Sequence, residues 1–130
     1  MAIKYFNAEE LERKLKCTVH KSGKLGFSDG ATKRMDIGDN TRIKIGYDEA
    51  EGENGEILYM QVDNTGSPEG FKVNKAGAYY YLNTKALFDS MGVNYSDDGL
   101  TIIYDMTEIT HDQEVVFKLT KREVRRRNRN

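Results

Sequence analysis

Residues 19–27 read VHKSGKLGF, and residues 73–81 read VNKAGAYYY. Both stretches contain Val-x-Lys-x-Gly followed by apolar or aromatic residues, and they begin 54 residues apart. Glycine supplies the positive φ that a tight hairpin needs, so each stretch predicts two short antiparallel strands with a glycine at the turn. The recurrence leads to the hypothesis that the chain holds two copies of one folding unit.

The segments that surround the two hairpins follow the same order. The first half predicts strand, strand, helix, strand and strand over residues 16–21, 24–27, 29–36, 41–48 and 56–63. The second half predicts the same order over residues 71–74, 78–82, 84–91, 100–106 and 114–121, with 107–113 as a loop. Asn83 is expected to cap the second helix and Gly92 to end it. A further short helix is predicted over residues 8–15, capped by Asn7.

The expected fold class is mainly β: a single domain over residues 1–130 with internal repeats 17–63 and 71–121. A unit of two hairpins exposes strand edges, and two units interleaved around a pseudo-two-fold axis remove those edges by forming a small swapped-hairpin barrel. Alternation predicts a core of Val19, Leu25, Phe27, Ile43, Ile45, Tyr47, Leu58, Met60, Val73, Tyr79, Tyr81, Leu87, Ile102, Tyr104, Val116 and Phe117.

The run TVHKSGKLGFSDGATKRMDIGDNTRIKIGYDE, residues 18–49, resembles the swapped-hairpin domains of AbrB/MazE-type transcription regulators. The matching features are Gly23, the strand 24–27, the Gly38-Asp39 step and the strand 42–46. The second half matches through Lys75, Gly77 and the helix that ends at Gly92. The resemblance implies a swapped-hairpin barrel and a non-enzymatic DNA-binding or regulatory module, here with both units on one chain.

The resemblance also implies which residues bind double-stranded DNA. In the hairpins and helices these are Lys21, Lys24, Lys33, Arg34, Lys75 and Lys85. Separately, the basic charge of a tail over 122–130, which is expected to be flexible, offers Arg125, Arg126 and Arg127 as further contacts to the DNA backbone. Lysine and arginine release counterions when they contact phosphates, which gives a salt-dependent affinity. The alternative for each residue is a solvated surface charge, and for the tail a solubilising role.

Charge is uneven along the chain, although the net charge is only −1. Residues 1–35 hold eight Lys and Arg against four Asp and Glu, and residues 36–70 hold two against nine. The acidic middle favours a second hypothesis: a structural or assembly protein of a phage or mobile element that binds a protein partner through barrel loops. The sequence leaves a monomer and a homo-oligomer equally open.

Signals of catalysis are weak. Cys17-x-x-His20 has the spacing of metal ligands but lacks a second pair, and His111 has no sequence partner that suggests a nucleophile and base. We therefore expect no enzyme activity, no metal and no cofactor. Tyr79-Tyr80-Tyr81 offers a stacking platform for bases, but alternation predicts that Tyr79 and Tyr81 point inward and only Tyr80 outward. The chain shows no signal peptide or membrane span, which predicts a cytoplasmic protein.

Overall fold

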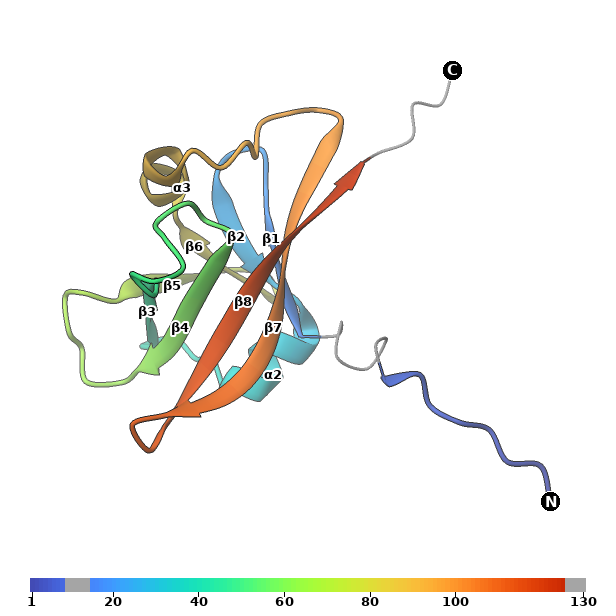
Figure 1. The fold of residues 1–130 in the computed structure, drawn as a ribbon. Coiled ribbons are helices and arrows are strands. Elements are labelled where there is room, and N and C mark those ends of the chain that lie inside the picture. Colours follow the sequence, from blue (N-terminus) through green and yellow to red (C-terminus); the bar gives the residue numbers. More distant parts are fainter. Residues whose placement is uncertain (9–14, 126–130) are drawn as a thin grey trace.

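A computed structural model describes residues 1–8 and 15–125 of the chain, and within them eight antiparallel strands form a closed barrel with a short helix at each end (Figure 1). The elements are β1 (Lys16–Val19), β2 (Lys24–Phe27), α2 (Asp29–Met35), β3 (Arg42–Gly46), β4 (Ile57–Asp63), β5 (Phe71–Ala76), β6 (Tyr79–Asn83), α3 (Lys85–Met91), β7 (Leu100–His111) and β8 (Glu114–Arg125). The predicted helix over 8–15 lies mostly outside the described residues. Neither helix in the described part of the chain has the length and apolar character needed to cross a membrane.

The barrel closes in the strand order β1-β2-β6-β5-β3-β4-β8-β7. Hairpin partners lie next to each other, and four further pairings join strands from different halves of the chain: β1 with β7, β2 with β6, β3 with β5, and β4 with β8. Because the sheet closes on itself, every strand has a neighbour on each side, which limits the exposure of backbone hydrogen-bonding groups. The mainly β fold predicted from the sequence is therefore confirmed.

Inward side chains of the strands fill the barrel, and most of the predicted core is buried there: Val19, Leu25, Phe27, Ile43, Leu58, Met60, Val73, Ile102, Tyr104 and Phe117. Ile45 and Leu87 are half-buried against this core. The prediction was wrong for Tyr47 and Tyr79, which are exposed, and for Tyr81 and Val116, which are half-buried and point outward. In β6 the buried residue is Leu82, and a shift of one residue reverses the direction of every side chain in the strand.

The helices begin and end at residues that explain their short length. Ser28 accepts a hydrogen bond from the Ala31 amide at the start of α2, and Asp36 ends that helix in the left-handed region. Thr84, not the predicted Asn83, precedes α3, and its hydroxyl donates to the Gly23 carbonyl at 2.8 Å. Gly92 ends α3 with a φ of 71°, as the sequence predicted. The Thr84 bond ties α3 to the turn between β1 and β2.

The β7–β8 hairpin is longer than predicted. Residues 107–111, expected in a loop, continue β7, and only Asp112 and Gln113 form the turn, with φ values of 49° and 66°. Positive φ at both central residues is the geometry of a type I′ turn, whose twist matches that of the flanking strands. β8 continues to Arg125, so residues 122–125 of the predicted tail pair with β7. Residues 126–130 lie outside the described part of the chain.

Candidate nucleic-acid interface

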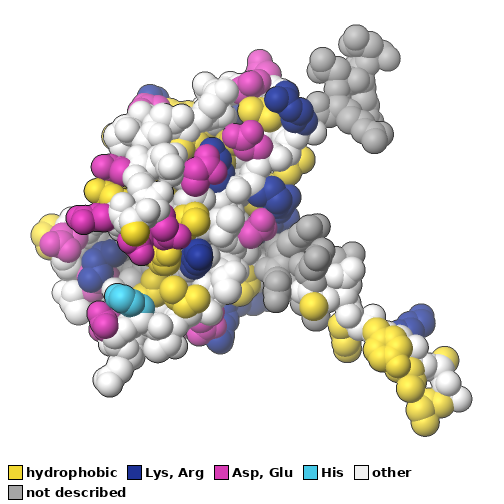
Figure 2. Space-filling view, viewed as in Figure 1, with side chains coloured by type: hydrophobic (Ala, Val, Ile, Leu, Met, Phe, Trp, Pro, Cys, Tyr) yellow, Lys and Arg dark blue, Asp and Glu magenta, His cyan; other side chains and the backbone are white. Residues whose placement is uncertain are grey.

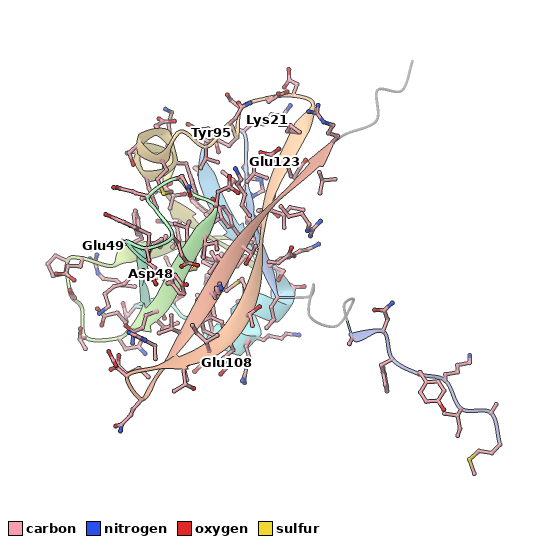
Figure 3. The ribbon with its side chains drawn as sticks, viewed as in Figure 1. Lys21, Asp48, Glu49, Tyr95, Glu108 and Glu123 are labelled. Carbon is pink, nitrogen blue, oxygen red and sulfur yellow. The ribbon has the colours of Figure 1, made fainter. Side chains whose placement is uncertain are left out.

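The basic residues predicted to bind DNA do not form one surface. Lys21 and Lys24 flank the β1–β2 turn beside α3, whereas Lys33 and Arg34 lie in the last turn of α2, at the other end of β2. Figure 3 shows this separation, because Lys21 lies at the end of the barrel that carries α3 while Glu108, the partner of Arg34, lies at the opposite end.

The remaining predicted residues are also dispersed. Lys75 lies near the end of β5, Arg125 is the last residue of β8, and Lys85 in α3 pairs with Asp89 at 2.7 Å. Arg126 and Arg127 fall outside the described residues. No single basic patch therefore unites the positions that the family resemblance implied.

Ion pairs divide these cations into two groups. Lys21 pairs with Asp98, and the Arg34 Nε donates to the Glu108 carboxylate at 2.7 Å. By contrast, within the described residues the structure gives no ion pair for Lys24, Lys33 or Lys75, nor for Lys72, which the sequence had not singled out. An ammonium group without a carboxylate neighbour is available for a phosphate, because no existing ion pair has to be broken.

Two of these lysines lie on an outer sheet surface that also carries two tyrosines. This surface, here the tyrosine face, comprises the outward side chains of β2, β6 and β5: Lys24, Gly26, Tyr79, Tyr81, Asn83, Lys72 and Asn74. The strand register makes them neighbours, because Gly26 and Asn74 lie directly opposite Tyr81 on either side. On the other side of the same three strands, Leu25, Leu82 and Val73 point inward and are buried. The tyrosine face is therefore the solvent side of the barrel wall.

Tyr79 lies across Gly26. A Cβ atom built on Gly26 would overlap the Tyr79 hydroxyl oxygen. Any residue other than glycine at position 26 would therefore require the Tyr79 side chain to move. The hydroxyl is also 2.5 Å from the Nε2 of His20, whose ring meets the Tyr79 ring edge-on. Partial burial against β2 raises the pKa of Tyr79. Tyr79 is nonetheless 38% exposed to solvent.

Tyr81 and Tyr80 each meet a lysine, but on opposite sides of β6. The Lys24 ammonium lies 4.8 Å from the centre of the Tyr81 ring on the outer face. Tyr80 instead points inward and packs against the core, with the Lys75 ammonium 5.6 Å from its ring centre. Both distances are within the range of cation–π attraction. Lys24 and Tyr81 therefore form one positively charged aromatic pair on the tyrosine face.

Two further basic residues, Lys72 and Arg42, lie on the same outer side of the neighbouring strands β5 and β3. Lys24 lies opposite Asn83 in β6, and Lys72 in β5 lies opposite Arg42 in β3. The Arg42 guanidinium donates to the Gly70 carbonyl at 3.0 Å, which holds it against the 64–70 connector. The outer surface of four adjacent strands thus presents Lys24, Lys72 and Arg42 next to two tyrosines.

The proposed metal-ligand spacing is not assembled in the fold. Cys17 points into the core and is fully buried, while His20 is exposed beside Tyr79. Burial, with the nearby charge of Asp105, raises the pKa of the Cys17 thiol, which therefore remains protonated at neutral pH. Among residues 1–8 and 15–125, no group of three or more His, Cys, Asp or Glu side chains is arranged to hold a metal ion.

Comparisons with protein families, with curated proteins and with solved structures found no significant match to this chain.

Sequence reasoning missed Lys72 and the outward direction of Tyr79 and Tyr81. One signal for the tyrosines was present: Gly26 interrupts the strand KLGF, and a glycine inside a strand often marks the close approach of another group. No comparable signal identified Lys72, because its neighbours Arg42 and Asn83 come from separate parts of the chain.

Proposed function

We propose that this protein is a DNA-binding module that uses the tyrosine face to hold a strand of DNA. The observation that carries this proposal is the presence of Lys24 and Lys72, for which the described residues give no ion pair, beside the outward Tyr79 and Tyr81 on one sheet surface. A non-enzymatic regulatory role follows from the likeness to AbrB/MazE-type domains and belongs to the same proposal.

Each residue type would make a different contribution to such binding. The lysines attract phosphates and release counterions, which gives affinity that falls with salt and does not depend on sequence. The tyrosine rings offer apolar surface on which unpaired bases stack, worth about 1–3 kcal/mol per base. Because stacking requires unpaired bases, we expect single-stranded DNA to bind more tightly than a duplex of the same sequence.

Fluorescence anisotropy with labelled single-stranded and duplex DNA of mixed sequence, at two salt concentrations, tests the proposal. The double variant Lys24→Gln/Lys72→Gln should weaken binding and reduce the slope of log affinity against log salt by roughly 1.4, since each phosphate contact to a single strand contributes about 0.7. Tyr81→Ser should weaken binding without changing that slope.

Lys33→Gln is the matched control, because Lys33 is an exposed lysine that has no ion pair with another described residue and lies on α2, away from the tyrosine face. We expect it to bind as the unmodified chain does. Loss of affinity in Lys33→Gln but not in the double lysine variant would locate binding at α2 instead. Absence of measurable binding at low salt would refute the proposal.

The duplication of a ββαββ unit is part of the same proposal. If each strand is replaced by the strand four places further along the chain, counted cyclically, every pair of neighbouring strands becomes a pair that is also present in the barrel. For example, β1-β2 becomes β5-β6, β1-β7 becomes β5-β3, and β2-β6 is converted into itself. This symmetry of connectivity supports a pseudo-two-fold axis of the swapped-hairpin kind. An experimental structure in which residues 17–63 fail to superpose on residues 71–121 would contradict it.

A further inference from the structure

Residues 1–8 form a segment rich in apolar side chains that are exposed to solvent. The side chains of Met1, Ile3, Tyr5 and Phe6 are all exposed, with 89% of Tyr5 and 86% of Phe6 accessible to solvent. Figures 1 and 2 show this segment, here the arm, leading away from the barrel with its apolar side chains in solvent. Four large apolar residues in a stretch of six is an unusual concentration for a solvated surface.

A groove on the barrel has the complementary character. It lies on the outer face of β3, β4 and the β7–β8 hairpin and has a volume of about 600 Å³. Its lining includes Gly46, Tyr47, Tyr59, Ile109, His111 and Val116, of which we call Tyr59, Ile109 and Val116 its apolar floor. Asp48 and Glu49 form part of its wall. Figure 2 shows apolar side chains on this part of the surface with carboxylates, a histidine and Lys or Arg side chains around them. We name it the β3–β8 groove.

Gly46 is the reason that the groove is hollow. It lies opposite Tyr59 in the sheet, and a Cβ atom built on it would have no neighbour within 4 Å. The missing side chain therefore leaves space that the protein itself does not fill. On the far side, Ile109 and Val116 lie opposite each other in the β7–β8 hairpin and supply apolar surface.

We propose that the arm of one copy binds in the β3–β8 groove of a second copy. Ile3, Tyr5 and Phe6 would cover the apolar floor, and Lys4, the single charged side chain among residues 1–6, would meet the carboxylates of Asp48 and Glu49. The apolar contact supplies the affinity and the charge contact sets the direction of the arm. In Figure 1 the arm does not contact its own barrel, and we assign the groove that it fills to another molecule.

The size of the contact determines the strength to expect. An arm of six residues buries less surface than the roughly 1,600 Å² of a standard protein interface, so one arm in one groove should bind with a Kd on the order of micromolar. Such a contact joins different surfaces on the two copies, so it forms either a reciprocal dimer with two exchanged arms or a longer chain of molecules.

Two variants of the full chain separate the arm from the groove. The arm variant carries Tyr5→Ser and Phe6→Ser, and its exposed positions make no contribution to the core. The groove variant carries Gly46→Gln, whose side chain enters the space above Tyr59; Gly46 does not have a positive φ, so the backbone accepts the substitution. Circular dichroism and thermal unfolding should show both variants folded as the unmodified chain is.

Sedimentation velocity from micromolar to several hundred micromolar then tests the proposal. The unmodified chain should associate as its concentration rises, and each variant alone should remain a monomer. An equimolar mixture of the two variants should form a dimer and nothing larger, because it contains one intact arm and one intact groove per pair. An unmodified chain that stays monomeric throughout, including one whose arm folds onto its own barrel, would overturn the proposal, as would variants that associate unchanged.

The charge contact has its own test. Lys4→Glu should weaken association at low salt by about tenfold or more, whereas Lys4→Arg should preserve it. Equal association of both variants would remove Asp48 and Glu49 from the contact and overturn that part of the assignment. The groove does not include the tyrosine face, so neither the arm variant nor the groove variant should change the affinity for DNA. The proposal of arm exchange and the proposal of DNA binding therefore fail or succeed separately.

Discussion

The hydroxyl of Tyr79 occupies the space above Gly26, where a methyl group would lie 1.3 Å from its oxygen. Gly26→Ala therefore has to displace the Tyr79 side chain. Because the displaced atoms are the end of a partly exposed side chain and not backbone, the free energy of unfolding should fall by less than ~1 kcal/mol. The pKa of Tyr79, raised by burial against β2, should decrease toward its ordinary value. A pH titration of the Tyr79 ring by NMR measures this shift.

Two controls isolate the contact between Gly26 and Tyr79. Gly46→Ala places the same methyl group on another strand glycine with open space around it and should leave the Tyr79 titration unchanged. In a Tyr79→Ala background, Gly26→Ala has no ring to displace and should no longer destabilise the fold. A double-mutant cycle with no interaction free energy would contradict the close approach.

Tyr104→Phe should destabilise the barrel by about 1–3 kcal/mol, measured by urea denaturation, because it leaves a buried carbonyl without a partner. The Tyr104 ring is fully buried, and its hydroxyl donates to the Gly55 carbonyl at 2.6 Å. Tyr95→Phe is the matched control, since that hydroxyl donates to Asp89, which keeps Lys85 as a second partner. Equal losses of stability in the two variants would show that the Tyr104–Gly55 hydrogen bond contributes no more to stability than the Tyr95–Asp89 hydrogen bond.

Thr65→Val should reduce stability at neutral pH, and this effect should shrink as the pH falls through the folded pKa of Asp63. The hydroxyl and the amide of Thr65 both donate to Asp63, at 2.5 and 2.8 Å, and hold the pKa of that carboxyl below its ordinary value. A lowered pKa in the folded state stabilises the fold above the unfolded pKa of roughly 3.9, and this contribution is lost as the pH falls through the folded pKa.

Urea denaturation at a series of pH values measures the difference for the Asp63 contact. Thr65→Ser keeps the donating hydroxyl and should follow the pH dependence of the unmodified chain. A difference between Thr65→Val and Thr65→Ser that does not shrink as the pH falls would assign the effect to packing and not to the Asp63 charge.

Asp112→Asn with Gln113→Gly should stabilise the tip of the β7–β8 hairpin by about 0.5–1 kcal/mol. Both positions have positive φ, and Asn-Gly adopts the type I′ turn with less strain than Asp-Gln. Hydrogen exchange of the amides in residues 107–116 should slow accordingly. Gln113→Val, a β-branched residue in the left-handed region, should accelerate the same exchange; unchanged rates in both variants would contradict the assigned turn.

The fold was more predictable than the candidate site because its signals are local. The turn at Gly23, the end of α3 at Gly92 and the alternation of Ile43 with its polar neighbours each depend on residues close in the chain. The site depends on which strands become neighbours. Lys24 and Tyr81 are separated by 56 intervening residues in the sequence and meet only because β2 pairs with β6.

The direction of the tyrosines shows where local reasoning ends. In Tyr79-Tyr80-Tyr81, three identical residues give alternation no means of choosing a face. Leu82 is fully buried, and because side chains alternate along a strand, Tyr80 also points inward. Gly26 then supplied the outer surface on which Tyr79 lies.

By itself, the sequence determined the mainly β class and most strand positions, because hairpin turns and apolar alternation are properties of neighbouring residues. Only the tertiary structure decided the register of β6, the pairing of lysines with carboxylates and the hollow above Gly46. Those features depend on contacts between strands that are distant in the chain. In β6, the free energy gained by burying Leu82 rather than a neighbouring tyrosine decides which side chains point inward.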